Sequence, residues 1–492
     1  MPPHEGCNMR PELGAFWQAL AAHGSRVALS NGSRTLTYAE LLVEVEQRTA
    51  QLTGLQAQRV ALCLDNSIEW VLWDLALLFS ERVCVPVPDF FSDRQKVHVL
   101  DSAGVDTLIG GPSVLASRCG FVGCGLDIAQ RALTAVPVLP DGTQKITYTS
   151  GTTGQPRGVC LDDGVQLAVA QSLLQATGAC ASDRHLCVLP LATLLENIAG
   201  IYTPLLAGAR IELRGMTDIG LQGASGLDLP RLLGHVLTIA PSSLILVPQL
   251  LMALVSAAER GMALPPSLRF VAVGGGRVAP QLLQRADALG LPVFEGYGLS
   301  ECASVVCLNT PQHRRIGAVG RPLPHLQISL ALDGEVLVRG ARMLGYLGDA
   351  ALKNDWLATG DLGHFEEGFL VLHGRKKHQF ITAYGRNVNP EWVEAELTQQ
   401  APIAQAWVHG EALPGNLAVL VLRDAALSDA EVAAVVARVN VGLPDYARVQ
   451  HWRRADHAFS PANGFATTNG RLRRTALWAH YEGQFAVPPV TH

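Results

Sequence analysis

Residues 148–159 read YTSGTTGQPRGV, a loop rich in Gly, Ser and Thr that follows the apolar lead 145–148. Glycines allow successive backbone N–H groups to point at one anion. Hydroxyl groups along the loop add donors, and Arg157 adds a fixed positive charge with a planar donor fork. The stretch therefore predicts a polyphosphate site, although an ordinary polar turn would have a similar composition. No Lys follows the glycines as the P-loop of NTPases requires, so that motif is excluded.

Strand-like and helix-like stretches alternate on both sides of this loop. Residues 59–64 and 83–87 are apolar and β-rich, and 67–79 between them has helical apolar spacing. This alternation predicts an α/β fold with largely parallel sheets, and it recurs at 107–109, 145–149, 185–189, 243–247 and 270–273. Beyond about residue 325, Asp-Gly and Gly turns predict antiparallel strands at 327–332, 334–339 and 368–372.

The bulk composition is that of a globular protein. A chain of 492 residues predicts more than one domain, and 48% hydrophobic with 16% charged residues suits a large core. The net charge of −5, with no basic block, argues against a nucleic-acid partner. Ten scattered cysteines without a CxxC pair predict reduced thiols in a cytoplasmic protein.

No targeting or transmembrane segment is predicted. The N-terminus has no apolar stretch of the signal-peptide type. The uncharged stretch 232–258 is interrupted by Pro241 and Pro248 and carries His235, so it predicts a helix, a strand and a helix rather than a membrane span. Peripheral contact with a membrane is left open.

Further motifs stand in a fixed order along the chain. With 149–158, they resemble the adenylate-forming superfamily of acyl-CoA synthetases, firefly luciferase and peptide-synthetase adenylation domains. Tyr297-Gly-Leu-Ser-Glu301 resembles its YGxTE motif, and Thr359-Gly-Asp361 its TGD motif. The hinge motif and the strand beyond it are matched by 374–377 and 384–388, and the C-terminal NGK motif by 469–474. The resemblance covers nearly the whole chain.

The resemblance implies a fold and a two-step reaction. The expected fold is α/β: a large N-terminal domain, 1–374, with two mostly parallel sheets and a small β-barrel, and a small mobile α+β domain, 375–492. A carboxylate attacks the α-phosphate of ATP to give an acyl-adenylate and pyrophosphate, and a thiol then displaces AMP. ATP, Mg²⁺ and either CoA or carrier-protein phosphopantetheine are the implied cofactors.

The same resemblance assigns roles to individual residues. Tyr297 and Ser300 would contact the adenine and the α-phosphate, and Glu301 would bind Mg²⁺. Asp361 would accept the ribose hydroxyls beside Arg375, and Lys377 would be the hinge. The remaining nucleotide contacts are expected from the phosphate loop, the adenine wall and the residue after Tyr297: Thr149, Ser150, Gly151, Thr152, Thr153, Gly154, Arg157, Gly274, Gly275, Gly276 and Gly298.

Arg471 is a departure from the family pattern. The family has a Lys there that reaches the reacting carboxylate and phosphate, and Arg157 also stands where Lys is common. Arg471 is either a working cation or a sign that the adenylating charge has been lost. Arg outnumbers Lys by 33 to 5 in this chain, which favours the first interpretation.

The acid is expected to be apolar. Residues 189–200, LPLATLLENIAG, resemble the acyl segment of long-chain fatty acyl-CoA synthetases, as does GRNVNPEWVEAEL at 385–397. Predicted substrate contacts are Thr193, where many members have His, and Leu194, Glu196 and Asn197. The segment is equally consistent with a core helix.

Three functions stay open: a fatty acyl-CoA synthetase acting on a medium- or long-chain acid, an acyl-AMP ligase that loads an acyl carrier protein, and a non-catalytic ATP- or acyl-binding protein.

Overall fold

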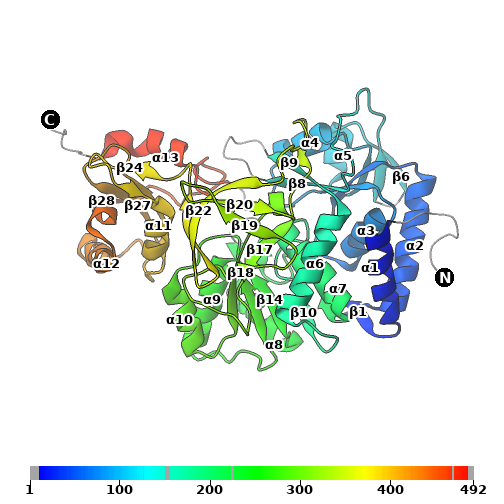
Figure 1. Ribbon diagram of the computed structural model, residues 1–492, viewed down its shortest axis with the longest axis horizontal. Coiled ribbons are helices and arrows are strands. Elements are labelled where there is room, and N and C mark those ends of the chain that lie inside the picture. The colour runs from blue at the N-terminus through cyan, green and yellow to red at the C-terminus, as the bar shows by residue number, and fades with distance from the viewer. Residues whose placement is uncertain (1–9, 126, 150–155, 223–225, 468–469, 486–492) are drawn as a thin grey trace.

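The computed structural model describes residues 10–125, 127–149, 156–222, 226–467 and 470–485. Elements of the C-terminal part, orange to red in Figure 1, gather at one end of the molecule, and helices α1 (Pro11–Ala22) and α2 (Tyr38–Gly54) lie at the other. Within the described ranges, no helix combines the length and the apolar character that crossing a bilayer requires. Every cysteine described is a free thiol, as predicted.

The largest sheet has nine strands in the order β18-β17-β16-β15-β14-β10-β11-β1-β2. The inner strands from β16 to β1 are parallel, and the strands at both ends are antiparallel. Its strands are β1 (Val27–Ser30), β2 (Thr35–Thr37), β10 (Arg184–Leu186), β11 (Arg210–Glu212), β14 (Ser243–Leu246), β15 (Phe270–Val273), β16 (Val293–Leu299), β17 (Ser304–Leu308) and β18 (Arg321–Pro322).

A second sheet has eight strands in the order β21-β9-β8-β4-β3-β5-β7-β6, of which β8, β4, β3 and β5 are parallel. Two large sheets were expected and both are present. The first is mostly parallel as expected, whereas the second is mixed, with three parallel and four antiparallel pairs of neighbouring strands. Its strands are β3 (Arg59–Cys63), β4 (Val83–Pro86), β5 (Thr107–Gly110), β6 (Val122–Gly125), β7 (Ile128–Gln130), β8 (Lys145–Thr149), β9 (Arg157–Leu161) and β21 (Gly345–Tyr346).

Helix α3 (Ile68–Phe79) shows why the N-terminal core holds together. Ser67 caps it by accepting a hydrogen bond from the backbone N–H of Trp70, and apolar residues cover all its faces. A helix that is apolar all round must be buried, and every described side chain of α3 except Glu69 is fully or nearly fully buried. Among these buried and mainly apolar side chains, Asp74 is a carboxylate, and it is only 1% exposed.

The other helices of this domain are α4 (Asp93–Ser102), α5 (Ser113–Arg118), α6 (Asp163–Thr177), α7 (Thr203–Ala207), α8 (Leu229–Ile239), α9 (Pro248–Glu259) and α10 (Pro280–Ala288). Helix α8, strand β14 and helix α9 fall in the uncharged stretch 232–258, so its predicted division into helix, strand and helix is confirmed. A short hairpin is formed by β12 (Leu221–Gln222) and β13 (Gly226–Leu227).

The antiparallel strands predicted beyond residue 325 form a four-stranded sheet, β19-β20-β22-β23. This sheet is an open half-barrel with β19 and β23 at its edges. Its strands are β19 (Gln327–Leu330), β20 (Glu335–Arg339), β22 (Leu357–Glu366) and β23 (Phe369–Arg375).

The C-terminal part builds its own hydrophobic core. Its two apolar clusters draw only on residues from 380 onward, and those of the N-terminal part only on residues before 375. The exact boundary, expected at 374, stays a prediction. The part contains β24 (Phe380–Ile381), β25 (Asn387–Val388), α11 (Pro390–Thr398), β26 (Ile403–His409), β27 (Asn416–Leu422), α12 (Asp429–Val441), β28 (Val449–Arg454) and α13 (Arg474–Tyr481).

Candidate active site

The predicted phosphate loop joins β8 to β9, which pair antiparallel from Lys145–Leu161 to Thr149–Arg157. Ser150, Gly151, Thr152, Thr153 and Gly154 lie outside the described residues. At the far side of the loop, the Arg157 guanidinium lies 3.8 Å from the ring centroid of Tyr346 and is ion-paired with Asp349 at 2.7 Å. Both charged side chains of this pair are more than half exposed, so the pair is weak and Arg157 can exchange it for a phosphate.

Strand β16 delivers the YGxTE-like residues to the same region. The chain turns sharply after Leu299 into a single 3₁₀ turn, Ser300–Cys302. Gly298 is required there by the backbone, because a Cβ on it would lie 1.5 Å from the carbonyl oxygen of Ser304. The Tyr346 hydroxyl donates to Glu301 Oε1 at 2.8 Å. Tyr346 therefore links the cation of the phosphate loop to the predicted magnesium ligand.

The glycines at 274–276 follow β15, and the first of them is buried. Gly275 has a φ of +78°, a conformation that favours glycine, and Gly275 and Gly276 are exposed. A Cβ on Gly276 would find only Pro248, at an ordinary contact distance of 3.5 Å. The packing of the protein does not require glycine at position 276. The absence of a side chain there leaves the space that a backbone wall against adenine would need.

Asp361 holds a central position in the site. Its Oδ1 is ion-paired with Arg375 Nε at 2.9 Å, and its Oδ2 accepts a hydrogen bond from the Tyr297 hydroxyl at 2.7 Å. Burial raises the pKa of Asp361, whereas Arg375 and the Tyr297 hydroxyl oppose that rise. Burial and the Asp361 carboxylate raise the pKa of Tyr297 far above its usual value. Three residues predicted for one nucleotide are thus in direct contact.

Arg471, from the C-terminal part, is near enough to the site for charges there to influence its pKa. Burial and the neighbouring Arg375 lower the pKa of Arg471, while Glu301, Glu391 and Asp361 counteract that shift. Arg471 is nevertheless exposed, and no carboxylate of the described chain lies within ion-pair distance of it. An accessible guanidinium among partly neutralised charges suits a polyanionic ligand.

The hinge residues divide between the two domains. Lys376 Nζ contacts Asp333 Oδ2 at 2.5 Å and Glu335 Oε2 at 3.0 Å, which fastens it to the N-terminal side. Lys377 is exposed, and burial together with Arg375 and Arg471 lowers its pKa. Lys377 is therefore the first residue of the motif without such a tether in the described part of the chain. Its role as the hinge stays a prediction.

Two contacts of the site were not predicted. Tyr346 carries no sequence signal, since it lies outside every motif and its partners come from distant segments. Glu391, at the start of α11, accepts a hydrogen bond from His378 Nδ1 at 2.6 Å. Although burial opposes the change, His378, Arg474 and Arg375 lower the pKa of Glu391 to about 2. The tract at 385–397 was noted for its resemblance to fatty acyl-CoA synthetases, but it did not identify Glu391.

The predicted acyl segment contains a π-helix, η1 (Leu195–Tyr202). Thr193 and Leu194 come immediately before it, and Thr193 is partly exposed. Glu196 and Asn197 are 0% and 2% exposed and bind protein groups instead. Asn197 bonds to Lys145 and Asp74, and Glu196 bonds to His185. Neither side chain is free to contact an acid in this structure, so substrate contact stays a prediction for Thr193 and Leu194.

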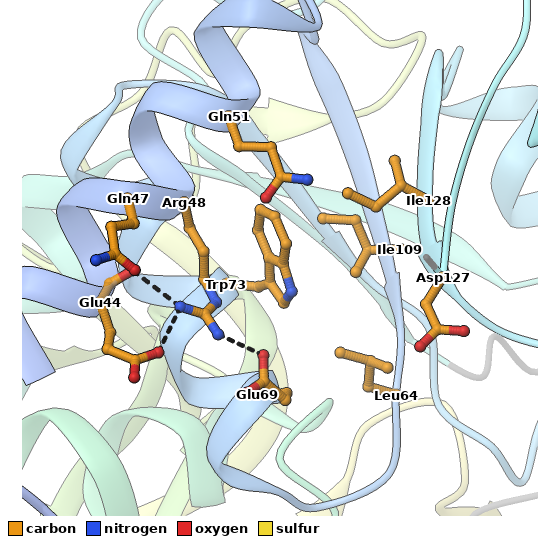
Figure 2. Close-up of a pocket in the computed structure, with 10 residues that line it drawn as sticks. All are labelled: Glu44, Gln47, Arg48, Gln51, Leu64, Glu69, Trp73, Ile109, Asp127 and Ile128. Carbon is orange, nitrogen blue, oxygen red and sulfur yellow. Dashed lines mark hydrogen bonds and ion pairs between the residues drawn. The ribbon is translucent and has the colours of Figure 1, made fainter. Parts of the chain in front are cut away.

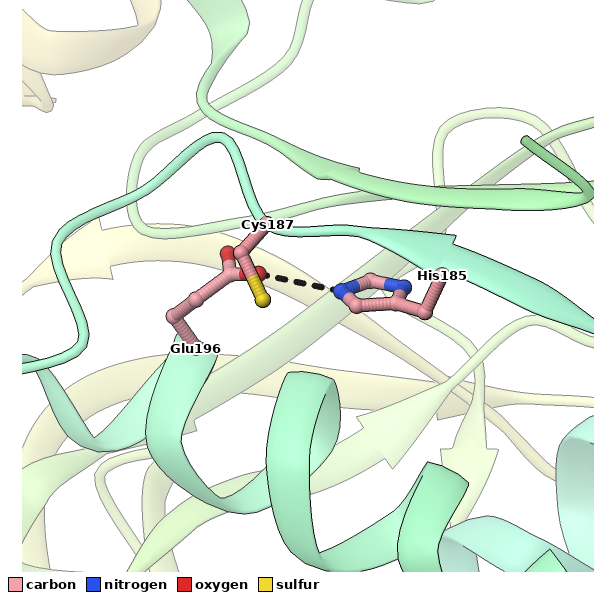
Figure 3. A group of neighbouring side chains, drawn as sticks. All are labelled: His185, Cys187 and Glu196. Atoms are coloured by element: carbon pink, nitrogen blue, oxygen red, sulfur yellow. Dashed lines mark hydrogen bonds and ion pairs between the residues drawn. The ribbon is translucent and has the colours of Figure 1, made fainter. Parts of the chain in front are cut away.

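Figure 3 shows the buried group that surrounds Glu196. His185 Nε2 lies 3.0 Å from Glu196 Oε1, and the Cys187 thiol lies beside this pair. Ligand atoms of these three residues lie within 4.8 Å of one another, a spacing that could hold a metal ion. However, burial and Glu196 raise the pKa of Cys187 well above its usual value, so the thiolate that a metal needs is disfavoured. His185 and Glu196 satisfy one another, which indicates a structural pair.

A cavity of about 420 Å³ lies away from these residues, between α2 and α3 (Figure 2). Trp73 forms part of its wall, and Arg48 on its polar side is paired with Glu44 at 2.9 Å and Glu69 at 2.6 Å. No predicted site residue lines it. The residues that the motifs assign to the nucleotide lie elsewhere, around Asp361.

Most of the chain is similar to known proteins. The family model of AMP-binding enzymes matches residues 16–347. A 2-succinylbenzoate–CoA ligase of Bacillus subtilis is 28% identical over 413 residues, covering 78% of this chain and 82% of that protein. A long-chain-fatty-acid–CoA ligase of Mycobacterium bovis is 27% identical over 441 residues, covering 73% and 72%.

Solved structures have the same fold. An anthranilate CoA ligase in complex with anthranoyl-AMP superposes with a TM-score of 0.79 at 18% identity, covering 98% of this chain and 99% of that one. The o-succinylbenzoate CoA synthetase of Bacillus subtilis, in complex with an acyl-adenylate, gives 0.77 at 23% identity, covering 96% and 98%. These likenesses support the architecture and the separate C-terminal domain.

Proposed function

The chain belongs to the family of AMP-binding enzymes, and we propose that it activates an apolar carboxylic acid, a medium- or long-chain fatty acid in the first instance, and transfers it to CoA. The coarser activity is that of an AMP-forming acid–thiol ligase that uses ATP and Mg²⁺. The observation that carries the proposal is the direct contact of Asp361 with Tyr297 and Arg375, three residues that the motifs assign to one nucleotide.

The first step brings the acid carboxylate to the α-phosphate of ATP, so two anions must approach. Positive charge that is already in place lowers the cost of that approach, because it need not reorganise during the reaction. Arg157 and Arg471 would supply this charge from opposite sides of the cleft. Ser300, at the 3₁₀ turn, would donate to the α-phosphate. A carboxylate oxygen of the acid, still bonded to the acyl carbon, then forms a bond to the α-phosphorus. The bond from that phosphorus to the oxygen bridging the β-phosphate breaks, and pyrophosphate leaves with that oxygen.

Glu301 fits a magnesium site because it is a partly exposed carboxylate at the cleft. Mg²⁺ prefers oxygen ligands and is held by few protein carboxylates together with phosphate oxygens. When bound, the ion would neutralise charge on the phosphates. Tyr346 would orient the Glu301 carboxylate through its hydrogen bond at 2.8 Å.

Nucleotide selection would depend on Tyr297 and Asp361. The Tyr297 ring would stack on the base, opposite the opening that Gly274, Gly275 and Gly276 leave. Each Asp361 oxygen has two lone pairs and already accepts one protein donor, so each can still accept a ribose hydroxyl. The protein contacts would hold the carboxylate in place for that purpose.

The nature of the acid rests on the segment around Thr193. Leu194 is buried and the flanking residues are apolar, which supports an alkyl chain. An aromatic acid is the second candidate, because 2-succinylbenzoate–CoA ligases stand among the similar proteins. The acceptor is proposed to be CoA, with carrier-protein phosphopantetheine as the alternative.

An acid panel tests the proposal. Pyrophosphate release is measured with ATP, Mg²⁺ and saturated acids of graded chain length, alongside benzoate and 2-succinylbenzoate. Products with CoA or with a loaded acyl carrier protein are then identified by mass spectrometry. Release with fatty acids and an acyl-CoA product would support the first candidate. Faster release with benzoate or 2-succinylbenzoate would show that the substrate is an aromatic acid. Transfer to the acyl carrier protein would show that the carrier protein, not CoA, is the acceptor. No release with any acid would favour a non-catalytic binding protein.

A further inference from the structure

Four side chains form a closed polar network inside the N-terminal domain. Lys145 Nζ donates to Asp74 Oδ1 at 2.9 Å, to Asn197 Oδ1 at 2.5 Å and to the Tyr202 hydroxyl at 3.0 Å. Asp74 Oδ2 accepts from Asn197 Nδ2 at 2.9 Å and from the Tyr202 hydroxyl at 2.6 Å. All four side chains are at most 2% exposed. The three donors of the ammonium group are therefore all used, and the charge is balanced inside the core.

The network depends on the π-helix geometry of η1. Asn197 and Tyr202 are five residues apart and both reach the same oxygen of Asp74. Residues five apart in an α-helix, at 3.6 residues per turn, point about 140° away from one another. The wider π-helix bonds residue i to i+5 and brings such a pair onto one face. The polar network and the π-helix therefore require each other.

The network joins two elements of the proposed active site. Lys145 is the first residue of β8, which runs to Thr149 and on into the phosphate-loop motif. Asn197 and Tyr202 lie in η1, directly after Thr193 and Leu194. A buried polar network in which every hydrogen bond is made rigidifies its surroundings. If one charged partner is removed, the other remains as an unpaired buried charge, which is strongly destabilising.

The two joined elements differ in their other support. Strand β8 is held by β9 along its whole length and by β4 at Lys145, so it would keep its place without the network. The irregular helix η1 has no sheet partner. Its second polar attachment is the Glu196–His185 pair, on strand β10. Loss of the network would therefore loosen the acid side and spare the ATP side.

We propose that Lys145 is a positioning residue for the acid: with Asp74 it fixes η1, and through η1 the residues Thr193 and Leu194, relative to the strand that enters the phosphate loop. The inference rests on the proposed function for the identity of the site, but the network itself does not. It does not concern the reacting atoms, since Lys145 is buried away from solvent.

The test uses the paired variant Lys145→Met/Asp74→Asn, which removes both charges with little change in volume. Lys145→Met alone would leave Asp74 unpaired and is expected to fold poorly. Cys84→Ala is the matched control, because the Cys84 thiol approaches Asp74 Oδ1 at 3.6 Å in the same cluster but belongs to β4. In the paired variant the KM for the acid should rise about tenfold, while the KM for ATP stays within about twofold and the control matches wild type.

A second measurement does not depend on activity. Amide hydrogen exchange within 195–202 should be about tenfold faster or more in the paired variant than in Cys84→Ala, with 145–149 unchanged. Unchanged exchange in 195–202 would overturn the inference, and so would an acid KM within twofold of wild type in a folded paired variant. If wild type activates no acid, the proposed function fails, and the exchange result still decides whether the network fixes η1.

Discussion

Arg375 and Asp361 face each other as registered partners of β23 and β22, with Arg375 Nε 2.9 Å from Asp361 Oδ1. Arg375 stands two residues before Lys377, the predicted hinge between the two domains. The same carboxylate is bonded to Tyr297. A group proposed to bind ribose is thus also a structural link between the nucleotide site and the start of the hinge.

Asp361→Asn should weaken nucleotide binding. The amide keeps one acceptor oxygen but offers N–H groups to Arg375, so the ion pair and one ribose acceptor are lost. Hydrogen bonds to charged groups contribute about 1.5–3 kcal/mol, which predicts a loss of roughly 10- to 100-fold in ATP affinity. Calorimetric titration with a non-hydrolysable ATP analogue measures this change in affinity. Glu366→Gln, an exposed carboxylate on the same strand paired with Arg315, is the control and should bind normally.

Gly276→Ala tests the adenine wall. The added Cβ meets only Pro248 at 3.5 Å, and Gly276 is not among the glycines with positive φ, so the free energy of unfolding should change by less than about 0.5 kcal/mol. A methyl group in the space proposed for the base should nevertheless weaken ATP analogue binding at least tenfold. Gly234→Ala, which adds a methyl group in open space on α8, controls for the substitution itself. Normal binding by Gly276→Ala would move the adenine site elsewhere.

Gly200→Ala should destabilise the fold although it lies in a helix. A Cβ there would lie 2.6 Å from Glu196 Oε1 and 2.8 Å from His185 Nε2, so the buried pair must separate. Leaving such groups unpaired costs about 1–3 kcal/mol. Gly14→Ala in α1 has no neighbouring atom within 4 Å and should instead stabilise by up to about 1 kcal/mol. Urea unfolding of both variants gives the comparison, and a Gly200→Ala protein as stable as wild type would contradict the tight packing of the pair.

Glu391 predicts a dependence of stability on acid pH. Its folded pKa of about 2 lies below the ordinary value of 4.5, so its stabilisation is fully present above pH 4.5 and is lost as the pH falls toward 2. Since its side chain is 32% exposed, solvent screening limits the contribution to about 1–2 kcal/mol. Glu391→Gln should therefore be less stable than wild type by that amount at pH 7, and the gap should narrow as the pH falls through this window. A gap that stays constant from pH 7 to pH 3 would show that the carboxylate charge contributes nothing.

The architecture could be predicted because each part of it leaves a local signal. Alternating apolar stretches indicated the parallel sheets, and Asp-Gly and Gly turns indicated the antiparallel sheet that ends in Arg375. The ordered motifs also indicated which side chains would share a cleft, and the structure brings Tyr297, Asp361 and Arg375 into direct contact.

The partners of buried polar residues could not be predicted in the same way. Lys145 lies in a stretch that is otherwise apolar and was predicted as a strand. Its partner Asp74 lies 71 residues away in the chain, in a helix whose one other charged residue is Glu69. No local sequence pattern predicts a pairing between two residues so far apart in the chain. For the same reason the sequence could not show that Asn197, which the resemblance places at the substrate, is held by Lys145 and Asp74.

Arg471 is the arginine proposed to act in adenylate formation. The structure shows that one of the neighbouring arginines is already engaged with another residue. The next arginines in the motif are Arg473 and Arg474. Arg474 donates to both oxygens of Glu394, at 2.8 Å and 2.6 Å, and is largely buried, so it is engaged in the C-terminal core. Arg471, by contrast, is exposed, and the charges of Glu301 and Asp361 influence its pKa. We therefore expect Arg471, rather than Arg474, to meet the reacting phosphate.

Arg471→Ala should slow acyl-adenylate formation by about 10²–10³, the usual effect of removing one preorganised donor at developing charge. Arg471→Lys, which restores the cation found in the family, should recover most of the rate, and Arg473→Ala is the matched control. Thioester formation from supplied acyl-adenylate should change much less, because the phosphate chemistry is then complete. Single-turnover measurements of each half-reaction separate these outcomes. An Arg471→Ala enzyme that forms adenylate at the wild-type rate would transfer the role to Arg473, and an equal loss in both half-reactions would indicate that Arg471 supports the domain arrangement rather than the reacting phosphate.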